Sequence, residues 1–440
     1  MVFERTVFQK KMQEQGLSEL RIKKFLETLE TLESGETGLL PEHKLHPASD
    51  VLNYENLESS QAPLDQVAMV KLNGGLGTSM GLSKAKSLLK VKGDDSFLDI
   101  VVKQTQALSE KVGRPLPLLL MNSYSTSQDS LKILAKYPSL NQSVPFEFLQ
   151  SKIPKIDTAS GRPANWPADP NLEWCPPGHG DIYLSLAESG IAKTLLEQGI
   201  KYLFVSNIDN LGATMDEKIL AHFASSGAPF LMEVTRRTNA DSKGGHLAKG
   251  LDGQLLLREV AQCPPSDIES FQNIEKHKFF NTNNLWLNLE LIEKELSTVT
   301  LPLIVNKKTV DPKDAQSTPV VQAETAMGAA IAVFQGSQAL NVPRTRFAPV
   351  KKTSDLLLVR SNLYHLDQEF RLRATQSSLP TVKLSEDYKL IRDFEERIGA
   401  DLDLTECQSL ELTGDVRIKP GTKLRGNIEL KNTGTEPIYF

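Results

Sequence analysis

The sequence predicts an α/β protein with a mostly parallel, helix-covered sheet, preceded by a helical segment and followed by short strands. Three observations lead to this fold class. Short apolar runs alternate with segments of helical length from about residue 63 to 350, residues 3–34 carry apolar side chains at helical spacing, and residues 410–430 place apolar residues between small turns. The 440 residues suffice for two or three domains, because single cores usually stop growing near roughly 250–300 residues.

The N-terminal segment has the pattern of an amphipathic helix. Apolar side chains recur close to i, i+3, i+4 spacing at Leu17, Leu20, Ile22, Phe25, Leu26 and Leu29. The chain is charged from residue 4 onward and lacks the apolar core of a signal peptide, and no run of 18 apolar residues occurs in it. We therefore expect a cytoplasmic protein that is neither secreted nor bound to a membrane.

Composition excludes several classes of partner and site. With 50 Lys and Arg against 55 Asp and Glu, the net charge is −5, so no global basic field recruits nucleic acid or anionic lipid. Cys175, Cys263 and Cys407 lie far apart without C-x-x-C spacing, which argues against a metal cluster and a disulfide framework. We expect reduced, partly buried thiols.

The central region alternates predicted strands and helices. The apolar runs lie at residues 67–70, 116–121, 202–206, 229–234 and 285–289. The segments of helical length lie at 96–110, 128–136, 183–197 and 215–226. This alternation is typical of a parallel sheet covered by helices.

A glycine-rich stretch, KLNGGLGTSMG at residues 71–81, directly follows the first apolar run. Its glycines can supply positive φ angles or let a ligand approach the main chain closely, and the second use is typical of phosphate sites. The spacing from Gly75 to Gly81 has one residue too many for the dinucleotide fingerprint, and no Lys-Ser/Thr pair follows at the Walker A offset. An ordinary glycine-rich turn is the alternative.

Polar residues follow the predicted strands, at the sheet edge where α/β proteins bind ligands. Lys84 and Lys86 follow the glycine loop and could fold back over phosphates, with solvated surface charges as the alternative. Asp209 follows the run at 202–206 and suits Mg²⁺, which prefers one or two carboxylates plus phosphates and waters. A helix N-cap is the alternative for Asp209.

Two further stretches suggest ligand binding. WCPPGHGDIY at 174–183 sets His179 between two glycines, which would leave its backbone open to a ligand. Residues 342–359 hold Arg344, Arg346, Lys351 and Lys352 before a strand-like run at 356–359. This basic cluster is a candidate anion site, with a solvated surface as the alternative.

The C-terminal part changes character after a helix-like segment at 388–399. Residues 410–430 read LELTGDVRIKPGTKLRGNIEL, with small turns expected near Gly414, Gly421 and Gly426. The pattern favours short stacked coils of a β-helix. A hairpin or meander is the alternative.

Nine ordered motifs resemble the eukaryotic-type UTP–glucose-1-phosphate uridylyltransferases, also called UDP-glucose pyrophosphorylases. They are KLNGGLGTSMG (71–81), FLQSKIPKI (148–156), WCPPGHGDIY (174–183), FVSNIDNLGAT (204–214), EVTRRTNADSKGGHL (233–247), FNTNNLWLNL (280–289), IVNKKTVD (304–311), ETAMGAAI (324–331) and VPRTRFAPVKKTSDLLLV (342–359). The resemblance implies a doubly wound, Rossmann-like, GT-A-type nucleotidyltransferase domain at 61–365. It further implies an N-terminal helical segment at 1–60 and a C-terminal left-handed β-helix at 366–440.

The activity implied by the resemblance is the reversible, Mg²⁺-dependent conversion of UTP and glucose 1-phosphate into UDP-glucose and pyrophosphate. The family's C-terminal part commonly mediates subunit contacts, which leaves open a homo-oligomer through that domain. One alternative is a broad-specificity UDP-sugar pyrophosphorylase, although LNGGLGT differs from the LAGGQGT of the acetylhexosamine branch. The other is a non-catalytic nucleotide-binding relative, which would be expected to lose the phosphate lysines or the metal carboxylate.

The matched motifs also imply a set of site residues. Uridine would lie against Leu72, Gly74 and Gly75, with base and ribose read by Gln150, Gly178 and His179. Lys86 would meet the triphosphate, Lys351 the phosphates of sugar and nucleotide, and Asp209 the metal. The sugar hydroxyls would face Asn207, Glu259, Asn281 and Asn283. Three motifs depart from the family: its GPKS is KAKS at 84–87, its NSFNT is NSYST at 122–126, and its EVTDKT is EVTRRT at 233–238.

The implied chemistry suits these residue types. A phosphomonoester has its second pKa near ~6, so at neutral pH it is already an anionic nucleophile and needs no general base. The transfer instead needs in-line positioning and neutralised charge on the attacked phosphate and leaving pyrophosphate, which are roles for Mg²⁺ and lysine. The glycines at 74–81 would then let the main chain lie against a nucleotide.

Overall fold

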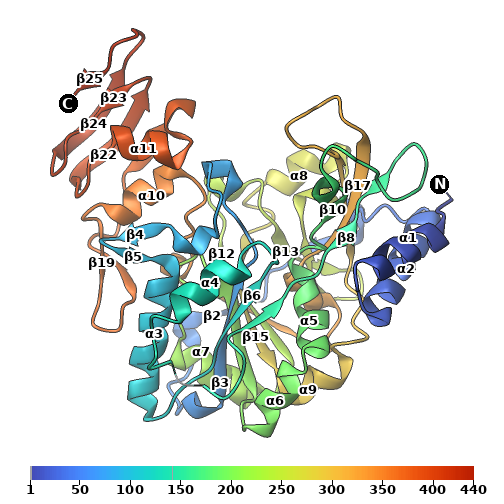
Figure 1. Cartoon of the computed structure of the whole chain (residues 1–440). Helices are drawn as coiled ribbons and strands as arrows, with labels where there is room; N and C mark the ends of the chain where they lie inside the picture. The colour runs from blue at the N-terminus through green and yellow to red at the C-terminus, as the bar shows by residue number, and fades with distance from the viewer. Residues whose placement is uncertain (1, 141) are drawn as a thin grey trace. The chain divides into compact units, whose positions relative to one another are not determined.

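The structure, a computed structural model, describes residues 2–140 and 142–440. It is an α/β protein with a large mixed sheet of 11 strands (Figure 1). The chain forms two compact units. Unit 1 holds the residues up to Ser59, Gln150–Tyr202 and His222–Val342, and unit 2 holds Ser60–Leu149, Leu203–Ala221 and Pro343–Phe440.

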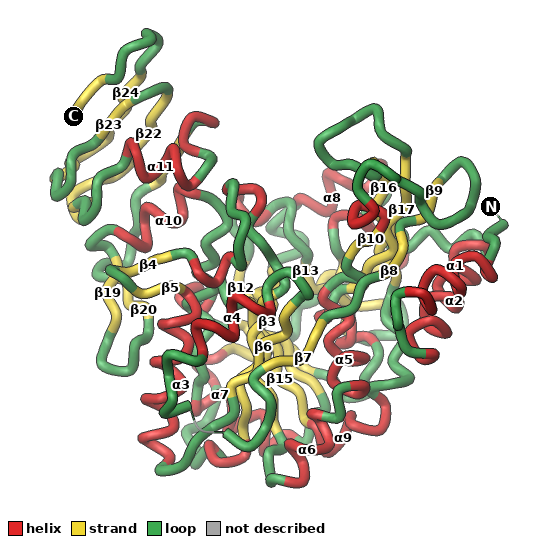
Figure 2. The backbone as a smooth tube through the Cα atoms, in the orientation of Figure 1, coloured by secondary structure: helices red, strands yellow, loops and turns green. Residues whose placement is uncertain are grey.

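In unit 1, the sheet strands follow the order β2 (Leu52–Asn53), β18 (Gln338–Asn341), β12 (Phe230–Arg236) and β15 (Phe279–Asn288). β18 pairs in parallel with β2 and β12, whereas β12 and β15 are antiparallel neighbours. β12 and β15 belong to the central sheet, drawn as yellow strands in Figure 2. β13 (His246–Gly250) pairs antiparallel with β15, β1 (Leu45–Pro47) and β14 (Leu255–Arg258). The sheet is therefore mixed rather than mostly parallel, because an apolar run reveals a buried strand but not its direction.

Smaller elements complete unit 1. A second, antiparallel sheet has the order β16 (Leu303–Thr309), β17 (Pro319–Thr325) and β9 (Ile156–Asp157). β8 (Ile153–Pro154) pairs antiparallel with β10 (Trp174–Cys175), and the short helices α8 (Ile268–Gln272) and α9 (Leu289–Ile292) flank β15 in sequence.

In unit 2, the sheet order is β11 (Tyr202–Asn207), β3 (Val67–Asn73), β6 (Leu118–Asn122) and β7 (Glu147–Leu149). β3 pairs in parallel with β6, and β6 with β7. α3 (Phe97–Val112) runs between β3 and β6 in sequence and packs beside α4 (Ser127–Leu134) (Figure 1). α3 begins at a capping box, in which Ser96 N–H donates to Asp99 Oδ2 at 2.9 Å and Asp99 N–H to Ser96 Oγ at 3.2 Å.

The predicted strands and helices of the central region are confirmed. The five apolar runs overlap β3, β6, β11, β12 and β15, and the helical segments overlap α3, α4, α5 (Ile182–Glu188) with α6 (Ile191–Glu197), and α7 (Glu217–Ser226). The prediction of a strand at 356–359 is wrong, because these residues lie in α10 (Thr353–Arg360). A short apolar run fits a buried strand and a buried helix equally well. Here the Asp355 carboxylate accepts the N–H groups of Lys351 and Lys352 at 2.8 Å, which stabilises a helix start.

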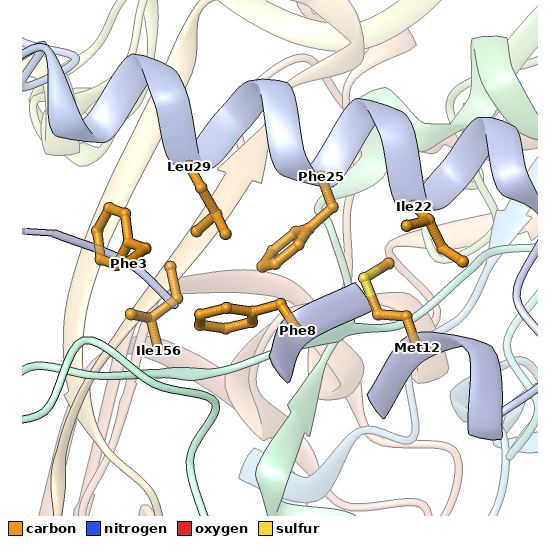
Figure 3. Packing of buried hydrophobic residues seen from close by; sticks show 7 residues of the cluster. All are labelled: Phe3, Phe8, Met12, Ile22, Phe25, Leu29 and Ile156. Atoms are coloured by element: carbon orange, nitrogen blue, oxygen red, sulfur yellow. The ribbon is translucent and has the colours of Figure 1, made fainter. Parts of the chain in front are cut away.

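The N-terminal residues form two helices, α1 (Arg5–Glu14) and α2 (Glu19–Glu33), separated by a turn in which Gly16 has φ 70°. Figure 3 shows the apolar side chains that pack between them, with the Phe8 and Phe25 rings 5.5 Å apart. The buried cluster consists of Phe3, Phe8, Met12, Ile22, Phe25, Leu29 and Ile156. Since Ile156 belongs to β9, burial of this apolar surface fastens both helices to the rest of unit 1.

The C-terminal strands of unit 2 pair in parallel. β21 (Thr381–Leu384), β22 (Asp403–Thr413) and β24 (Lys423–Lys431) form one sheet, and β23 (Val416–Arg417) pairs with β25 (Ile438–Tyr439). Hairpins and meanders join antiparallel strands, so that alternative is wrong for this region. Gly426, with φ 67°, lies inside β24 opposite Cys407 and beside a register shift, rather than in a turn. The remaining elements of unit 2 are β4 (Lys90–Lys92), β5 (Asp95–Ser96), β19 (Tyr364–Leu366), β20 (Leu372–Ala374) and α11 (Ile391–Arg397).

The three cysteines are free and buried. Burial raises the pKa of the Cys175 thiol to about 12 and also raises the pKa values of Cys263 and Cys407. Across residues 2–140 and 142–440, no helix has the length and apolar character needed to cross a membrane.

Candidate active site

The site residues predicted from the sequence divide between the two units. Unit 2 holds Leu72, Gly74, Gly75, Lys86, Asn207, Asp209 and Lys351. Unit 1 holds Gln150, Gly178, His179, Glu259, Asn281 and Asn283. Each unit therefore carries its own set of predicted ligand-binding groups.

The glycine loop of unit 2 starts from a hydrogen-bonded strand end. Asn73, the last residue of β3, is 2% exposed, and its amide donates to Asn122 Oδ1 and Ser130 Oγ, both at 2.7 Å. Ser123 Oγ donates to the Gly74 carbonyl at 2.9 Å. These bonds tie the ends of β3 and β6 together and fix the position from which the loop departs.

The glycines of this loop have two different functions. Gly77 and Gly81 have φ angles of 68° and 74°, and a Cβ on Gly77 would lie 2.8 Å from Leu82 Cδ1. These two glycines are required by the turn itself. A Cβ on Gly75, by contrast, would meet no atom within 4 Å. The space beside Gly75 is open, as a main chain that contacts a ligand requires.

Lys86 and Asp209 form an ion pair in unit 2. The ammonium Nζ lies 2.5 Å from Asp209 Oδ2, and the side chains are 16% and 19% exposed. The Lys86 N–H donates to the Gly75 carbonyl at 3.0 Å, so the lysine does fold back onto the glycine loop. Leu72 is hydrogen-bonded next to Asp209. Its carbonyl accepts the N–H of Ile208, the residue before Asp209, at 3.2 Å.

The alternative reading of Asp209 as a helix N-cap is wrong. Asp209 lies in a turn after β11, and the next helix, α7, begins only at Glu217. Asn207, the last residue of β11, precedes this turn and is half-buried. Ala85 stands where the family's GPKS has proline, and its φ of −52° is a value that proline also adopts.

The segment before α10 lies against the Asp209 turn. Val350 N–H donates to the Asp209 carbonyl at 3.1 Å. Buried Asn210 accepts the Ala348 N–H at 2.8 Å and donates to the Arg346 carbonyl at 3.2 Å. Exposed Lys351 directly follows Val350, so this hydrogen bond holds the Lys351 backbone close to Asp209.

Arg346 does not belong to an exposed anion-binding cluster. Its side chain is 8% exposed, its NH2 donates to the Thr214 carbonyl at 3.0 Å, and its NH1 lies 3.6 Å from Asp216 Oδ2. These contacts make Arg346 a structural residue. Arg344, Lys351 and Lys352 remain exposed.

The donor set around Asp209 fits Mg²⁺ with phosphate ligands. The described parts of the chain contain no group of three or more His, Cys, Asp or Glu that could hold a metal by themselves. One carboxylate supplemented by phosphate oxygens and waters is the arrangement that Mg²⁺ prefers. Asp209 offers that single carboxylate beside the glycine loop.

In unit 1, Gln150 and His179 converge on the loop at 178–181. Gln150 Nε2 donates to the Gly178 carbonyl at 2.8 Å. His179 Nδ1 accepts the N–H of Met327 at 2.9 Å, so the neutral imidazole carries its proton on Nε2. Burial lowers the pKa of His179 to about 4. The ring is therefore neutral at pH 7, with Nε2–H as its donor.

Gly178 and Gly180 do not leave the His179 backbone open, contrary to the prediction. A Cβ on Gly178 would lie 2.3 Å from the Thr325 carbonyl oxygen, and one on Gly180 would lie 2.3 Å from Thr325 Oγ1. The two glycines instead allow close packing on β17, where the Thr325 N–H donates to the Pro177 carbonyl at 2.9 Å.

Asn281 and Asn283 are bonded to each other at a bulge in β15. Asn281 Nδ2 donates to Asn283 Oδ1, and Asn283 N–H to Asn281 Oδ1, both at 2.9 Å. The register between β15 and β12 shifts here, and Asn283 has φ 58°. Bulges re-aim side chains and occur often beside active sites. Asn284 of the same motif is fully buried and donates to Glu233 Oε2 at 3.1 Å, which is a structural role.

Gly245 and Gly328 contact residues of unit 1 that the sequence predicted to bind the sugar. A Cβ on Gly245 would lie 2.6 Å from the Glu259 carboxylate, and the Gly245 carbonyl accepts the Asn281 N–H at 3.1 Å. A Cβ on Gly328 would lie 3.0 Å from Asn281 Nδ2, and Gly328 follows the Met327 that binds His179. Sequence reasoning missed Gly245 and Gly328, although KGGHL and AMGAA lie in the matched motifs.

Comparisons with known proteins identify the family of the chain. The sequence model of the UTP–glucose-1-phosphate uridylyltransferase family matches residues 22–425. The UTP–glucose-1-phosphate uridylyltransferase of Musa acuminata is 42% identical over 382 residues, which cover 86% of this chain and 80% of that protein. The probable enzyme of the same name from Schizosaccharomyces pombe is 42% identical over 371 residues, covering 83% and 73%.

Solved structures show the same fold. A mutant of Leishmania major UDP-glucose pyrophosphorylase in complex with UDP-glucose has a TM-score of 0.91 and 41% identity, covering 100% of this chain and 97% of that one. A Trypanosoma brucei protein described as a UDP-glucose phosphorylase has a TM-score of 0.90 and 42% identity, covering 99% and 96%. The chain belongs to the UTP–glucose-1-phosphate uridylyltransferase family.

Proposed function

We propose that this protein transfers the uridylyl group of UTP to glucose 1-phosphate, giving UDP-glucose and pyrophosphate. The observation that carries the proposal is the assembly of Lys86, Asp209 and the Lys351 backbone around one turn of unit 2. A phosphate oxygen of glucose 1-phosphate attacks the α-phosphorus of UTP. The bond between that phosphorus and the bridging oxygen to the β-phosphate breaks, and pyrophosphate leaves with the electron pair.

The phosphates require positive charge from this turn. Asp209 would hold Mg²⁺, which when bound supplies charge to the triphosphate oxygens. Lys86 is paired with Asp209 in the structure, and its ammonium group would contact the triphosphate of bound UTP. Lys351 supplies charge to the phosphates of sugar and nucleotide. Neither lysine has to transfer a proton to act in this way.

The uridine and the sugar engage the polar groups of unit 1 in this proposal. Neutral His179 offers Nε2–H, and Gln150 holds the Gly178 carbonyl. In the proposal, Asn207, Glu259, Asn281 and Asn283 bind the sugar hydroxyls. The mutual bonds of Asn281 and Asn283 limit the positions that their amides can take. This favours one arrangement of hydroxyl groups over others.

The direct test is pyrophosphate release from purified protein with UTP and Mg²⁺. Glucose 1-phosphate, galactose 1-phosphate and N-acetylglucosamine 1-phosphate are compared under identical conditions. Release confined to glucose 1-phosphate supports the proposal. Comparable rates with several sugars would instead support a broad-specificity UDP-sugar pyrophosphorylase, and no release with any sugar would support a non-catalytic nucleotide-binding protein.

Finer features of the fold and assembly are also proposals. The parallel pairing of β21, β22 and β24 favours a left-handed β-helix within 366–440, following a nucleotidyltransferase domain at 61–365 and a helical segment at 1–60. We further propose a cytoplasmic location and a homo-oligomer built through the C-terminal domain. Size-exclusion chromatography with light scattering, on the full chain and on a chain truncated before residue 366, tests the assembly.

A further inference from the structure

Asp181 is a buried carboxylate that joins the two segments of the nucleotide-reading loop. It lies two residues after His179, and its side chain is 5% exposed. Asp181 Oδ2 accepts the Ser151 N–H at 2.8 Å and the Ser185 hydroxyl at 2.9 Å. Because Ser151 follows Gln150, one carboxylate fixes the chain at both Gln150 and His179.

The charge of Asp181 is balanced by Arg21 from the N-terminal helix α2. Arg21 NH1 donates to Asp181 Oδ1 at 2.8 Å and NH2 donates to Ser185 Oγ at 3.0 Å, while Nε pairs with Glu188. The Arg21 side chain is 12% exposed. Its planar fork thus contacts both ends of the segment 181–188 in a geometry that lysine cannot reproduce.

The position of Arg21 is set by packing in the helical segment. The Arg21 N–H donates to Ser18 Oγ at 3.2 Å at the start of α2. Ile22, the next residue, and Phe25 belong to the buried cluster of Figure 3. This cap and this packing fix the position of the Arg21 backbone relative to the loop at 178–181.

The loop packs closely on β17 through Gly178 and Gly180, but a cavity lies beside another part of it. A cavity of about 580 Å³ is lined by Arg21, Pro177, Gly180, Asp181 and Thr325, among other residues of unit 1. Close packing normally fixes a buried segment, but here open space lies along part of it. Beside the cavity, the polar contacts of Asp181 add to the constraint that packing on β17 supplies.

We infer that Arg21 and Asp181 are positioning residues for nucleotide binding, through which helix α2 holds the loop at 178–181 in its binding conformation. This inference rests on the proposed function of His179 and Gln150. Neither residue touches the reacting phosphates in that proposal. Their loss is therefore expected to weaken UTP binding without slowing the transfer itself.

The test compares Arg21→Ala with Arg5→Ala as the matched control. Arg5 also pairs with carboxylates of α2, including Glu30 at 2.6 Å, but its partners lie outside the loop. Arg21→Ala leaves a buried carboxylate unpaired and should raise the KM for UTP about tenfold or more, with kcat and the KM for glucose 1-phosphate within about twofold. Arg5→Ala should leave all three constants unchanged.

Two additional variants keep the test decisive. Asp181→Asn in the Arg21→Ala background removes the unpaired charge and should restore part of the UTP affinity, whereas a merely structural pair would show no such rescue. Arg21→Lys retains the charge without the fork and should give an intermediate KM, which also serves if Arg21→Ala does not fold. An unchanged KM for UTP in the folded variants, or an equal rise with Arg5→Ala, overturns the inference.

Two different measurements distinguish a failure of the proposed function from a failure of this inference. Wild-type protein that releases no pyrophosphate contradicts the proposed activity. UTP affinity of the wild type and of the same variants, measured by calorimetric titration, still tests the positioning role, because that measurement does not depend on turnover.

Discussion

The ammonium group of Lys86 and the carboxylate of Asp209 lie 2.5 Å apart, and each is the other's counter-ion. Both groups are proposed to bind the triphosphate or its metal, so they satisfy one another until substrate arrives. In the proposed complex, the triphosphate would be the stronger partner for Lys86, and Mg²⁺ would be the stronger partner for Asp209. Each carries more charge than the side chain that it would replace. Under the proposed function, substrate binding would replace this ion pair.

Replacing Lys86 with methionine should abolish most of the activity while leaving the fold intact. A missing cation at the triphosphate costs on the order of 10²–10³ in kcat, whereas a partly exposed ion pair contributes at most about 1 kcal/mol to stability. Steady-state kinetics and urea unfolding measure the two effects. Exposed Lys84 provides the control, since Lys84→Ala should turn over normally, and a normal rate for Lys86→Met would contradict the assigned role.

Lys351 and Lys352 offer a second matched comparison. Both backbone N–H groups donate to Asp355 at 2.8 Å, so removing either side chain leaves the start of α10 intact. Lys351→Ala should lower kcat at least about tenfold through lost phosphate charge, and Lys352→Ala should lower it far less. The assay is pyrophosphate release at saturating substrates. Equal losses in both variants would point to general surface charge instead.

Asp209→Asn should shift the metal dependence of the reaction. The amide keeps the shape of the carboxylate but loses the negative charge that Mg²⁺ prefers, so the Mg²⁺ concentration at half-maximal rate should rise at least about tenfold. Rates over a range of free Mg²⁺ measure this shift. A variant with the same half-maximal concentration as the wild type would remove Asp209 from the metal site.

The left-handed conformation of Asn283 allows its backbone and side-chain roles to be separated. At φ 58°, alanine is strained by about 1–2 kcal/mol, whereas glycine adopts this angle freely. Asn283→Ala should therefore lose stability in urea unfolding, and Asn283→Gly should lose little. Both variants lack the amide, so both should show a raised KM for glucose 1-phosphate; an unchanged KM in Asn283→Gly would exclude a sugar contact.

Stability should fall as the pH drops below the ordinary histidine pKa. Burial lowers the pKa of His179 from 6.5 to about 4 and also lowers the pKa values of His246 and His277. In the unfolded chain, these histidines take up a proton below about pH 6.5, whereas His179 in the folded protein does so only near pH 4. Between pH 6.5 and pH 4 the unfolded state therefore binds more protons than the folded state.

For His179 alone, the free energy of unfolding at pH 5 should be on the order of 2 kcal/mol lower than at pH 7. Urea unfolding at both pH values measures the difference. His179→Asn, which keeps an acceptor for the Met327 N–H without a titrating ring, should reduce it. If the free energy of unfolding falls equally in His179→Asn and in the wild type, other groups cause the pH dependence.

The sequence predicted the positions of the main strands well, because β3, β6, β11, β12 and β15 are continuous apolar runs of strand length. It did not predict the antiparallel pairing of β12 with β15, since strand direction depends on the path of residues 237–278 between them. The run at 356–359 was misassigned because Asp355 at its N-terminal end caps a helix. Such a cap is a single local signal inside an otherwise ambiguous apolar pattern.

The candidate site shows a similar division. Residue types alone indicated Lys86 and Asp209, since lysine and carboxylate after adjacent strands suit phosphate and Mg²⁺. The motif gave no indication that Thr325 fills the space beside Gly178 and Gly180, because that contact joins positions far apart in the chain. The bulge at Asn283 was equally hidden, since it is defined by the register against Glu233 and Val234.

The burial of Cys175, Cys263 and Cys407 has a practical consequence. Their raised pKa values keep all three as thiols at neutral pH, and thiols react slowly with maleimides and iodoacetamides compared with thiolates. A cysteine introduced at an exposed position would therefore be labelled against a low background. Fluorescent or spin probes can be placed singly in each unit without first removing the natural cysteines, so that distances between the units during turnover become measurable in the otherwise unmodified protein.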